Sequence, residues 1–357
     1  MRKLIVSLAL SMGLSAYAGA KIEWDHIHHN FGAFNEDSGP VTAIFTLYNT
    51  GDEPLVITGA RANCGCTTPT YSADMVQPGD SATLTVSYDP GGRPGRFEKF
   101  VFVDTNTEPK QSKLSIKGVS VGSSSTIQGR YPVSVGQLRL THPAALLGSV
   151  IRGKVKSVFE AGYNASTDTL SPTVTDVPAW LNVKPYPERV PPGEQMSFSF
   201  LVTSDRVPFW DTVIDTVTVR PFPESTDLLR MPVIVTVTED FSSLSDRQKA
   251  DGPTVRFDKE RLDSVVLGEN GADVDLIIHN DGKNPLKLRR IYTSTKDVTI
   301  NVRPDQAIKG GKSQAVRIHL PGDCLSDSKA SAVILNVITN DPFNPRKTVT
   351  IPVTRQH

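Results

Sequence analysis

The chain has 357 residues, of which 38 are basic and 38 acidic, so its formal net charge is zero. This balance argues against electrostatic attraction of the whole surface to nucleic acid or to an anionic membrane. Hydrophobic residues make up 38%, which is too low for a protein with several membrane spans, and a total of 3 Cys excludes a scaffold stapled by many disulfides.

The first segment has the three parts of a secretory signal peptide. Arg2 and Lys3 precede an apolar run from Leu4 to Ala18, and small residues follow up to Ala20. The apolar run is shorter than the roughly 20 residues that a membrane-spanning helix needs. We therefore predict a signal peptide over residues 1–20, cleaved after Ala18 or Ala20, and a mature chain without a transmembrane segment. An uncleaved membrane anchor is the alternative.

The rest of the sequence contains three repeats. An Asn followed by turn-forming residues recurs at intervals of 115 and 116 residues (164 − 49 and 280 − 164), at Asn49, Asn164 and Asn280. A second turn follows each Asn after 29, 28 and 30 residues, at Pro78-Gly79, Pro192-Gly193 and Gly310-Gly311. Two turn signals at matched spacing in three places indicate tandem duplication of a domain-sized unit.

Between the turns, short runs rich in β-branched and aromatic residues are typical of strands. Residues 81–88, for example, alternate apolar and polar side chains, as a strand with one buried face does. We predict an all-β protein of three immunoglobulin-like β-sandwich domains, covering residues 21–121, 131–240 and 254–357. Two linkers join them: the Gly/Ser-rich residues 122–130, expected to be flexible, and residues 241–253, where we expect at most one helical turn.

Several motifs of the first domain recur in a known family. They are Phe31-Gly32, Asn49-x-Gly51 with Pro54-Leu55, Cys64-Gly65-Cys66-Thr67, Pro78-Gly79 and Gly95-x-Phe97. The domain thereby resembles the bacterial envelope family known as domain of unknown function 1573. The third domain keeps Asn280-Asp281-Gly282 but has Thr295 and Asp297 in place of the cysteines, and the more divergent second domain has Ala179 and Leu181 there. The resemblance implies an immunoglobulin-like fold akin to sperm-protein and cilium-associated modules, and it implies no activity.

Cys64 and Cys66 form the sharpest local feature. If both lie in one strand, their thiols share a face, and with His28 as a further ligand they form a candidate site for Cu(I) or Zn. A bond between the two cysteines would close a very small ring, and free cysteine packs as a small hydrophobe. Core packing is therefore the preferred interpretation, with a metal or redox role as the alternative. His28 shares a face with His26, and solvent-facing histidines are its ordinary interpretation.

Cys324 lies in the third domain at a position that does not correspond to either cysteine of the first. An odd cysteine in an oxidising compartment is either an unpaired thiol or bonded to another chain. A bond to Cys64 or Cys66 would require the first and third domains to fold back together.

Trp180 and Trp210, both in the second domain, are the best candidates for an exposed aromatic binding face. If their side chains are exposed, the two tryptophans indicate a surface that binds carbohydrate. Filling of the sandwich core by Trp180 or Trp210 is the preferred interpretation, with the binding face as the alternative.

Five Asp-Ser/Thr-aliphatic triplets begin at Asp80, Asp168, Asp211, Asp215 and Asp263. They resemble the O-glycosylation signal of some Gram-negative envelopes. The same triplet is also common where strands begin, so the pattern leaves modification open.

No catalytic motif is present: the sequence lacks a G-x-S-x-G elbow, an H-E-x-x-H pair, a P-loop and a dinucleotide glycine fingerprint. We therefore predict a non-enzymatic exported protein without a cofactor, located in the periplasm rather than at the cell surface or outside the cell. It would act through contacts with another envelope protein, possible modes including strand addition at sheet edges. A thiol-based metal or redox protein and a carbohydrate-binding protein are the alternatives, and the oligomeric state does not follow from the sequence.

Overall fold

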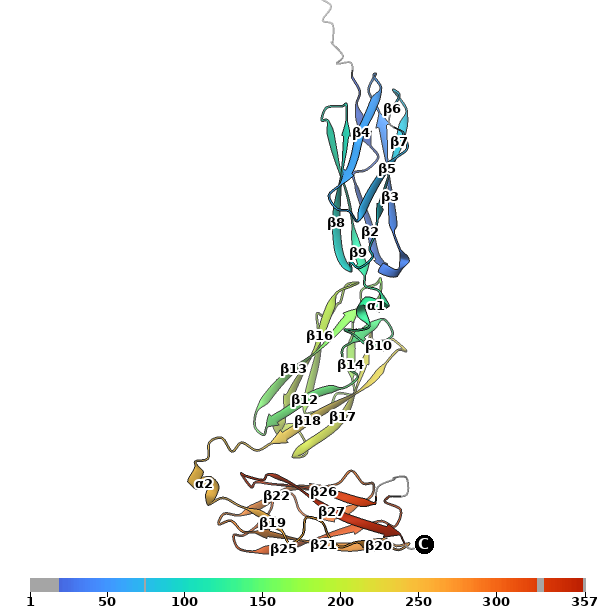
Figure 1. Cartoon of the computed structure of the whole chain (residues 1–357). Helices are drawn as coiled ribbons and strands as arrows, with labels where there is room; N and C mark the ends of the chain where they lie inside the picture. Colours follow the sequence, from blue (N-terminus) through green and yellow to red (C-terminus); the bar gives the residue numbers. More distant parts are fainter. Residues whose placement is uncertain (1–18, 74, 326–330, 356–357) are drawn as a thin grey trace, which may run out of the picture.

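The computed structural model describes residues 19–73, 75–325 and 331–355, which form three successive β-sandwich units (Figure 1). The predicted signal peptide lies almost entirely outside these residues. The strands of the first unit are β1 (Ile22–Trp24), β2 (His28–Asn35), β3 (Val41–Asn49), β4 (Leu55–Ala62), β5 (Thr67–Tyr71), β6 (Met75–Val76), β7 (Ser81–Tyr88), β8 (Gly95–Thr105) and β9 (Gln111–Val121). Those of the second are β10 (Val133–Val135), β11 (Leu138–Leu140), β12 (Ala145–Ile151), β13 (Val155–Asn164), β14 (Thr173–Thr175), β15 (Leu181–Tyr186), β16 (Gln195–Thr203), β17 (Asp211–Arg220) and β18 (Leu229–Thr238). Those of the third are β19 (Val255–Phe257), β20 (Val265–Leu267), β21 (Ala272–Asn280), β22 (Leu286–Tyr292), β23 (Thr299–Asn301), β24 (Gln306–Ile308), β25 (Ser313–Leu320), β26 (Ala332–Thr339) and β27 (Arg346–Arg355).

The three units share one topology. One sheet has the order β1-β3-β7-β5 in the first unit, and this order recurs as β11-β13-β16-β15 and β19-β21-β25-β23. The other has the order β2-β9-β8-β4, which recurs as β12-β18-β17-β14 and β20-β27-β26-β22. In each unit an early strand pairs parallel with the last strand, as β2 does with β9, β12 with β18 and β20 with β27. The prediction of an all-β protein built from repeated sandwiches is confirmed.

Each unit buries its own core between its two sheets. In the first unit, Phe45 and Leu84 from one sheet meet Val101 and Ile116 from the other, and all four are fully buried. Separate clusters of the same kind fill the second and third units. The apolar alternation of each strand therefore has a local explanation, since one face of each sheet packs on the facing sheet of the same unit.

The two repeated turn signals of the sequence are bonded to each other in space. In the first unit, the side-chain Nδ2 of buried Asn49 donates to the carbonyls of Glu53 and Val76, and its Oδ1 accepts from the Gly51 N–H. The N–H of Gly79, whose φ is +83°, donates to the Asn49 carbonyl. The same arrangement recurs around Asn164 with Gly193 and around Asn280 with Gly311. One buried amide thus closes the turn at the end of every sandwich.

The segment predicted to be a flexible linker, residues 122–130, forms an ordered connection instead. It contains the short helix α1 (Ser124–Ile127), and Ile127 packs with Val121, Tyr131 and Tyr163 in a small cluster between the first and second units. The connection makes contacts that its Gly/Ser composition does not predict, because the N–H groups of Gly122 and Ser123 closely approach side chains of the second and first units.

The second connection contains the single helical turn that the sequence predicts. Helix α2 (Asp246–Ala250) begins at Ser245, whose hydroxyl accepts from the Gln248 N–H while the Gln248 side chain accepts from the Ser245 N–H. This reciprocal capping box explains why so short a helix forms. Among the described residues, no helix is long and apolar enough to cross a membrane.

Candidate functional site

Cys64 and Cys66 are joined by a disulfide bond, with 5.3 Å between their Cα atoms. They lie in the turn between β4 and β5, where the chain crosses from one sheet to the other, and not in a strand. The expectation of two free thiols on one strand face is therefore corrected. Cys66 is buried in the core of the first unit, whereas Cys64 is half-buried between exposed Asn63 and Gly65.

The structure does not bring His28 and the two cysteines together as ligands. His28 is exposed on β2, and its Nδ1 lies 2.7 Å from the Ser115 hydroxyl. His26 precedes β2, so strand alternation does not apply to it, and its ring lies 6.3 Å from that of His29. Within the described ranges, no three His, Cys, Asp or Glu side chains are grouped closely enough to hold a metal ion. A metal site at Cys64, Cys66 and His28 stays a prediction that would need the reduced protein.

The two candidate tryptophans have different environments. Trp180 is only 3% exposed and belongs to the core of the second unit, which contradicts its prediction as an exposed binding residue. Trp210 is half-buried in the loop that leads into β17, and the guanidinium carbons of Arg152 and Arg289 each lie 4.6 Å from the centre of one of its rings. Trp210 is therefore part of the contact between the second and third units.

The first and second units meet at a contact centred on Glu36, which we call the first joint. Glu36 is 7% exposed, and its carboxylate accepts hydrogen bonds from the Gly92 N–H, the Ser123 N–H and the Thr126 hydroxyl. These donors come from a loop of the first unit and from the α1 connection. A carboxylate that accepts three hydrogen bonds fixes the connection to the end of the first sandwich.

The second unit completes the first joint through Tyr163. Its hydroxyl accepts from the Gly122 N–H at 3.1 Å, and its ring stacks on that of Tyr131. Burial, and secondarily the nearby Glu194 and Glu36 carboxylates, raise the pKa of Tyr163. An ion pair of 2.9 Å between Arg96 and Glu194 also links the two units.

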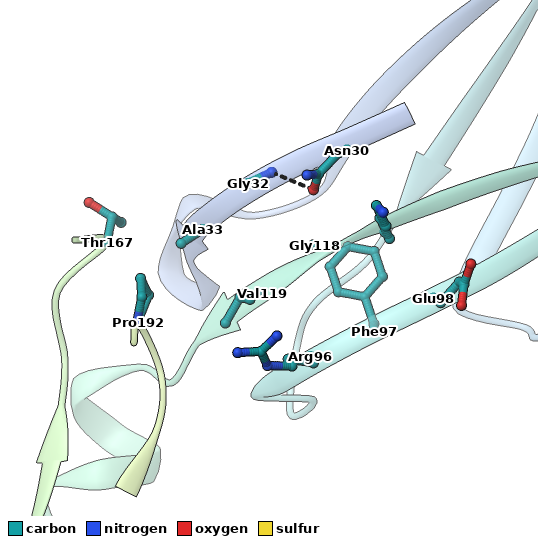
Figure 2. Close-up of a pocket in the computed structure, with 11 residues that line it drawn as sticks. Asn30, Gly32, Ala33, Arg96, Phe97, Glu98, Gly118, Val119, Thr167 and Pro192 are labelled. Atoms are coloured by element: carbon teal, nitrogen blue, oxygen red, sulfur yellow. Dashed lines mark hydrogen bonds between the residues drawn. The ribbon is translucent and has the colours of Figure 1, made fainter. Parts of the chain in front are cut away.

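A shallow cleft of about 620 Å³ lies beside the first joint (Figure 2). Phe97, Arg96 and the bulged part of β2 form its wall in the first unit, while Thr167 and Pro192 approach from the second. The bulge arises at Gly32, whose φ of +69° takes β2 out of register with β9. The cleft is thus open, and both polar and apolar side chains line it.

The second and third units meet around Asp211, in a contact that we call the second joint. Asp211 is 5% exposed and has a φ of +64°, a conformation that Asp tolerates better than most residues. Its Oδ2 accepts from the Tyr292 hydroxyl at 2.8 Å and lies 3.5 Å from Nε of Arg346. Burial, followed by the hydrogen bond to Asp211, raises the pKa of Tyr292.

Arginine side chains hold the rest of the second joint. Arg290 of the third unit donates to the carbonyls of Trp210 and Thr212 in the second, and its guanidinium carbon lies 4.6 Å from the centre of the Phe209 ring. Arg289 pairs with Glu239 at 2.7 Å. Burial opposes the charge of Arg289, but its hydrogen bonds to carboxylates outweigh burial and raise its pKa.

The five-stranded sheet of the second unit presents an apolar outer face between the two joints. Phe159 on β13 is 67% exposed, Leu201 on β16 is 37% exposed and Tyr186 on β15 is 76% exposed. The strand register places Phe159 opposite Ser199, so Leu201 is its diagonal neighbour, and Tyr186 lies opposite Ser197. Small serines between large apolar side chains leave these side chains accessible. We call this surface the outer face of the second unit.

Two comparisons address the sequence directly. A family described as "Protein of unknown function (DUF1573)" matches residues 22–120, which confirms the resemblance of the first unit. No curated protein matches the chain.

Solved structures resemble parts of the fold. One is a protein of unknown function from Porphyromonas gingivalis W83, which is 18% identical, with a TM-score of 0.45 over 61% of this chain and 99% of that chain. Another is the ASH/PapD-like domain of human CEP192, which is 14% identical, with a TM-score of 0.25 over 34% of this chain and 99% of that chain. Sequence identities and TM-scores this low assign no function to the chain.

Proposed function

We propose that the protein is a non-enzymatic, exported envelope protein that acts through protein–protein contacts, located in the periplasm. Its three sandwich units form a jointed arm, and the outer face of the second unit is its main contact surface. The exposed apolar side chains of that face are the observation that carries the proposal, because large apolar side chains exposed on one face of a sheet mark an interaction site.

The joints support the role of an arm. A freely jointed chain of domains would need no buried carboxylate at Glu36 and no buried Asp211 between units. Because both side chains accept hydrogen bonds across a connection, the orientation of one unit relative to the next is constrained. A constrained arm presents its binding face in a defined direction, which lowers the entropic cost of binding a partner.

Binding through a sheet face is favoured over the strand addition considered above. Most edge strands are three residues long or shorter, as β1, β14 and β20 are, or contain a proline, as β5 does at Pro69 and β15 at Pro185. The longer edges, β2 and β12, are interrupted by bulges. Short, proline-containing and bulged edges are the devices by which proteins prevent edge pairing.

The test is capture of a partner by surface variants of the full chain. Phe159→Ser and Leu201→Ser remove apolar area from the outer face without touching the core. We expect the partner that cross-links to the exported wild-type protein in intact cells to be lost from both variants. Val266→Ser, which changes an exposed apolar residue of the third unit, serves as the matched control and should retain it. Equal capture by all variants would reject the outer face as the contact surface.

A thiol–disulfide role is the second candidate. The observation that favours it is the half-buried Cys64, which makes the bond to Cys66 accessible to an attacking thiolate from one side. In such a role a partner dithiol would be oxidised to a disulfide as Cys64 and Cys66 are reduced to thiols. Trapping of a mixed disulfide with the Cys66→Ser variant, but not with Cys64→Ser, would support it.

A further inference from the structure

Beside the second joint lies a cleft of about 800 Å³ with an unusual concentration of positive charge. Its lining contains five arginines and two aspartates, a balance of three positive charges (5 − 2) in a chain whose net charge is zero. The charged residues are Arg152, Asp205 and Arg206 from the second unit and Arg289, Arg290, Arg303 and Asp305 from the third. We call this surface the arginine cleft.

Glu239, which lies outside the lining, offsets one of these charges by pairing with Arg289, and in the part of the chain that the structure describes the others have no ion-pair partner. Arg289 pairs with Glu239 and Asp305, each at 2.7 Å. Among the described residues, the other four arginines of the cleft form no ion pair. Arg206 and Arg303 are exposed, whereas Arg152 and Arg290 are half-buried.

The half-buried guanidinium groups are fixed by backbone carbonyls. Arg152 donates from Nη1 to the carbonyls of Ser204 and Val207 and from Nη2 to that of Phe209. Arg290 uses only Nη1, at 3.1 Å to the carbonyl of Trp210 and 2.9 Å to that of Thr212. Neutral carbonyls orient a guanidinium group but leave its full charge in place.

Arg290 therefore keeps one complete donor edge. A guanidinium group has five N–H donors, and the hydrogen bonds of Arg290 within the described ranges leave those on Nε and Nη2 unused. These two nitrogens form the edge that binds a carboxylate or phosphate through two parallel hydrogen bonds. The ring centres of Tyr292 and Phe209, 3.9 and 4.6 Å from its guanidinium carbon, hold the group in place.

Burial disfavours the positive charge of two arginines of the cleft. The pKa values of Arg152 and Arg290 are both lowered, first because burial disfavours the cation. Nearby acidic groups, which for Arg290 include the phenol of Tyr292, only partly offset this effect. A bound anion would supply the compensation that the chain itself does not provide.

We propose that the arginine cleft binds a saccharide that carries at least two phosphate or carboxylate groups. The cleft volume lies within the range of small-molecule sites and is far larger than a single inorganic ion requires. The exposed ring of Phe209 offers a surface on which a sugar ring packs, while the arginines bind its anionic groups. This inference goes beyond the proposed protein contacts and does not depend on them, because the cleft and the outer face have no residue in common.

The test is calorimetric titration of the full chain at low ionic strength with four probes: fructose 1,6-bisphosphate, trigalacturonate, inorganic phosphate and neutral maltotriose. We expect one-site binding of at least one of the two anionic saccharides, at least tenfold tighter than that of inorganic phosphate, and no binding of maltotriose. The affinity should fall as salt is raised, because exposed arginines contribute part of it. Absence of binding of both anionic saccharides at millimolar concentration, or equal binding of maltotriose, would overturn the proposal.

Variants then locate the site. Arg206→Gln and Arg303→Gln change exposed arginines that hold no part of the joint, and each should weaken binding at least fivefold with unchanged thermal stability. Arg189→Gln, at an exposed arginine of the second unit outside the cleft, is the matched control and should bind as the wild type does. Arg290→Gln should abolish binding. Wild-type affinity in Arg206→Gln, Arg303→Gln and Arg290→Gln alike would show that the anion binds elsewhere and would refute the assignment.

Discussion

The repeated asparagine makes a quantitative prediction about stability, for which Asn164 is the best position. Its Nδ2 donates to the carbonyls of Asp168 at 2.7 Å and Val190 at 2.9 Å, and its Oδ1 accepts from the N–H and hydroxyl of Ser166. Asn164 itself is completely buried. The Asn164→Ala substitution removes all four hydrogen bonds and leaves the Val190 carbonyl with the Leu170 N–H as its remaining donor.

The expected loss in the free energy of unfolding is large for a single substitution. At about 1 kcal/mol for each bond to the backbone, three such bonds give a loss of about 3 kcal/mol in the free energy of unfolding of the second unit. For a unit of this size, that corresponds to a fall of roughly 15 °C in the midpoint of its thermal transition. Asn164→Asp should cost at least as much, because a carboxylate would face two carbonyl oxygens.

Tryptophan fluorescence reports this transition, because Trp180 and Trp210 both lie in the second unit and Trp180 is 3% exposed. The control is Asn182→Ala, an exposed position on β15 whose side chain makes no hydrogen bond to the described residues; it should leave the midpoint unchanged. A loss below about 1 kcal/mol for Asn164→Ala, or one equal to that of the control, would refute the view that this amide closes the sandwich end.

Three further outcomes follow from the joints and the disulfide. Glu36→Gln leaves one acceptor oxygen for the Gly92 and Ser123 N–H groups, which now bond to different oxygens, so one of them faces a donor. Small-angle scattering should therefore detect greater flexibility between the first two units; unchanged scattering would contradict this role. Because the pKa of Tyr292 is raised from 10.0, the second joint should weaken as pH rises above that value, and Tyr292→Phe should reduce the alkaline loss of stability in a thermal-shift series. Alkylation without reductant should leave Cys64 and Cys66 unmodified in mass spectra, and free thiols at these positions would contradict the disulfide.

The repeat, and with it the fold, was predictable because its signals are local. Asn49 and Gly79 each need a particular residue type: a short amide that reaches two carbonyls, and a glycine at φ +83°. Such requirements leave an Asn and a Gly at nearly the same spacing in all three units. Strand alternation is equally local, since one sheet face is buried wherever a sandwich forms. Sequence patterns of this kind therefore predict the units well.

The state of the cysteines was harder to predict because it depends on the backbone between them. Ring size argues against a bond between residues two apart when both are assumed to lie in a strand. In the structure Cys64 and Cys66 lie in a turn, where their Cα atoms are 5.3 Å apart, within the range for disulfides. The error thus came from assigning a strand at the crossing between two sheets.

The joints could not be predicted, and the reason bears on where function lies. Glu36 and Ser123 are 87 residues apart, and Arg290 and Trp210 are 80 apart, with no periodicity to mark either pair. Each unit has its own core and its own asparagine turn, and Glu36, Ser123 and Arg290 belong to neither. Half-buried arginines held only by carbonyls are unfavourable for stability alone. An anionic ligand that neutralises these arginines best explains why they are concentrated beside the second joint. The arginine cleft is therefore the surface whose residues the fold alone explains least.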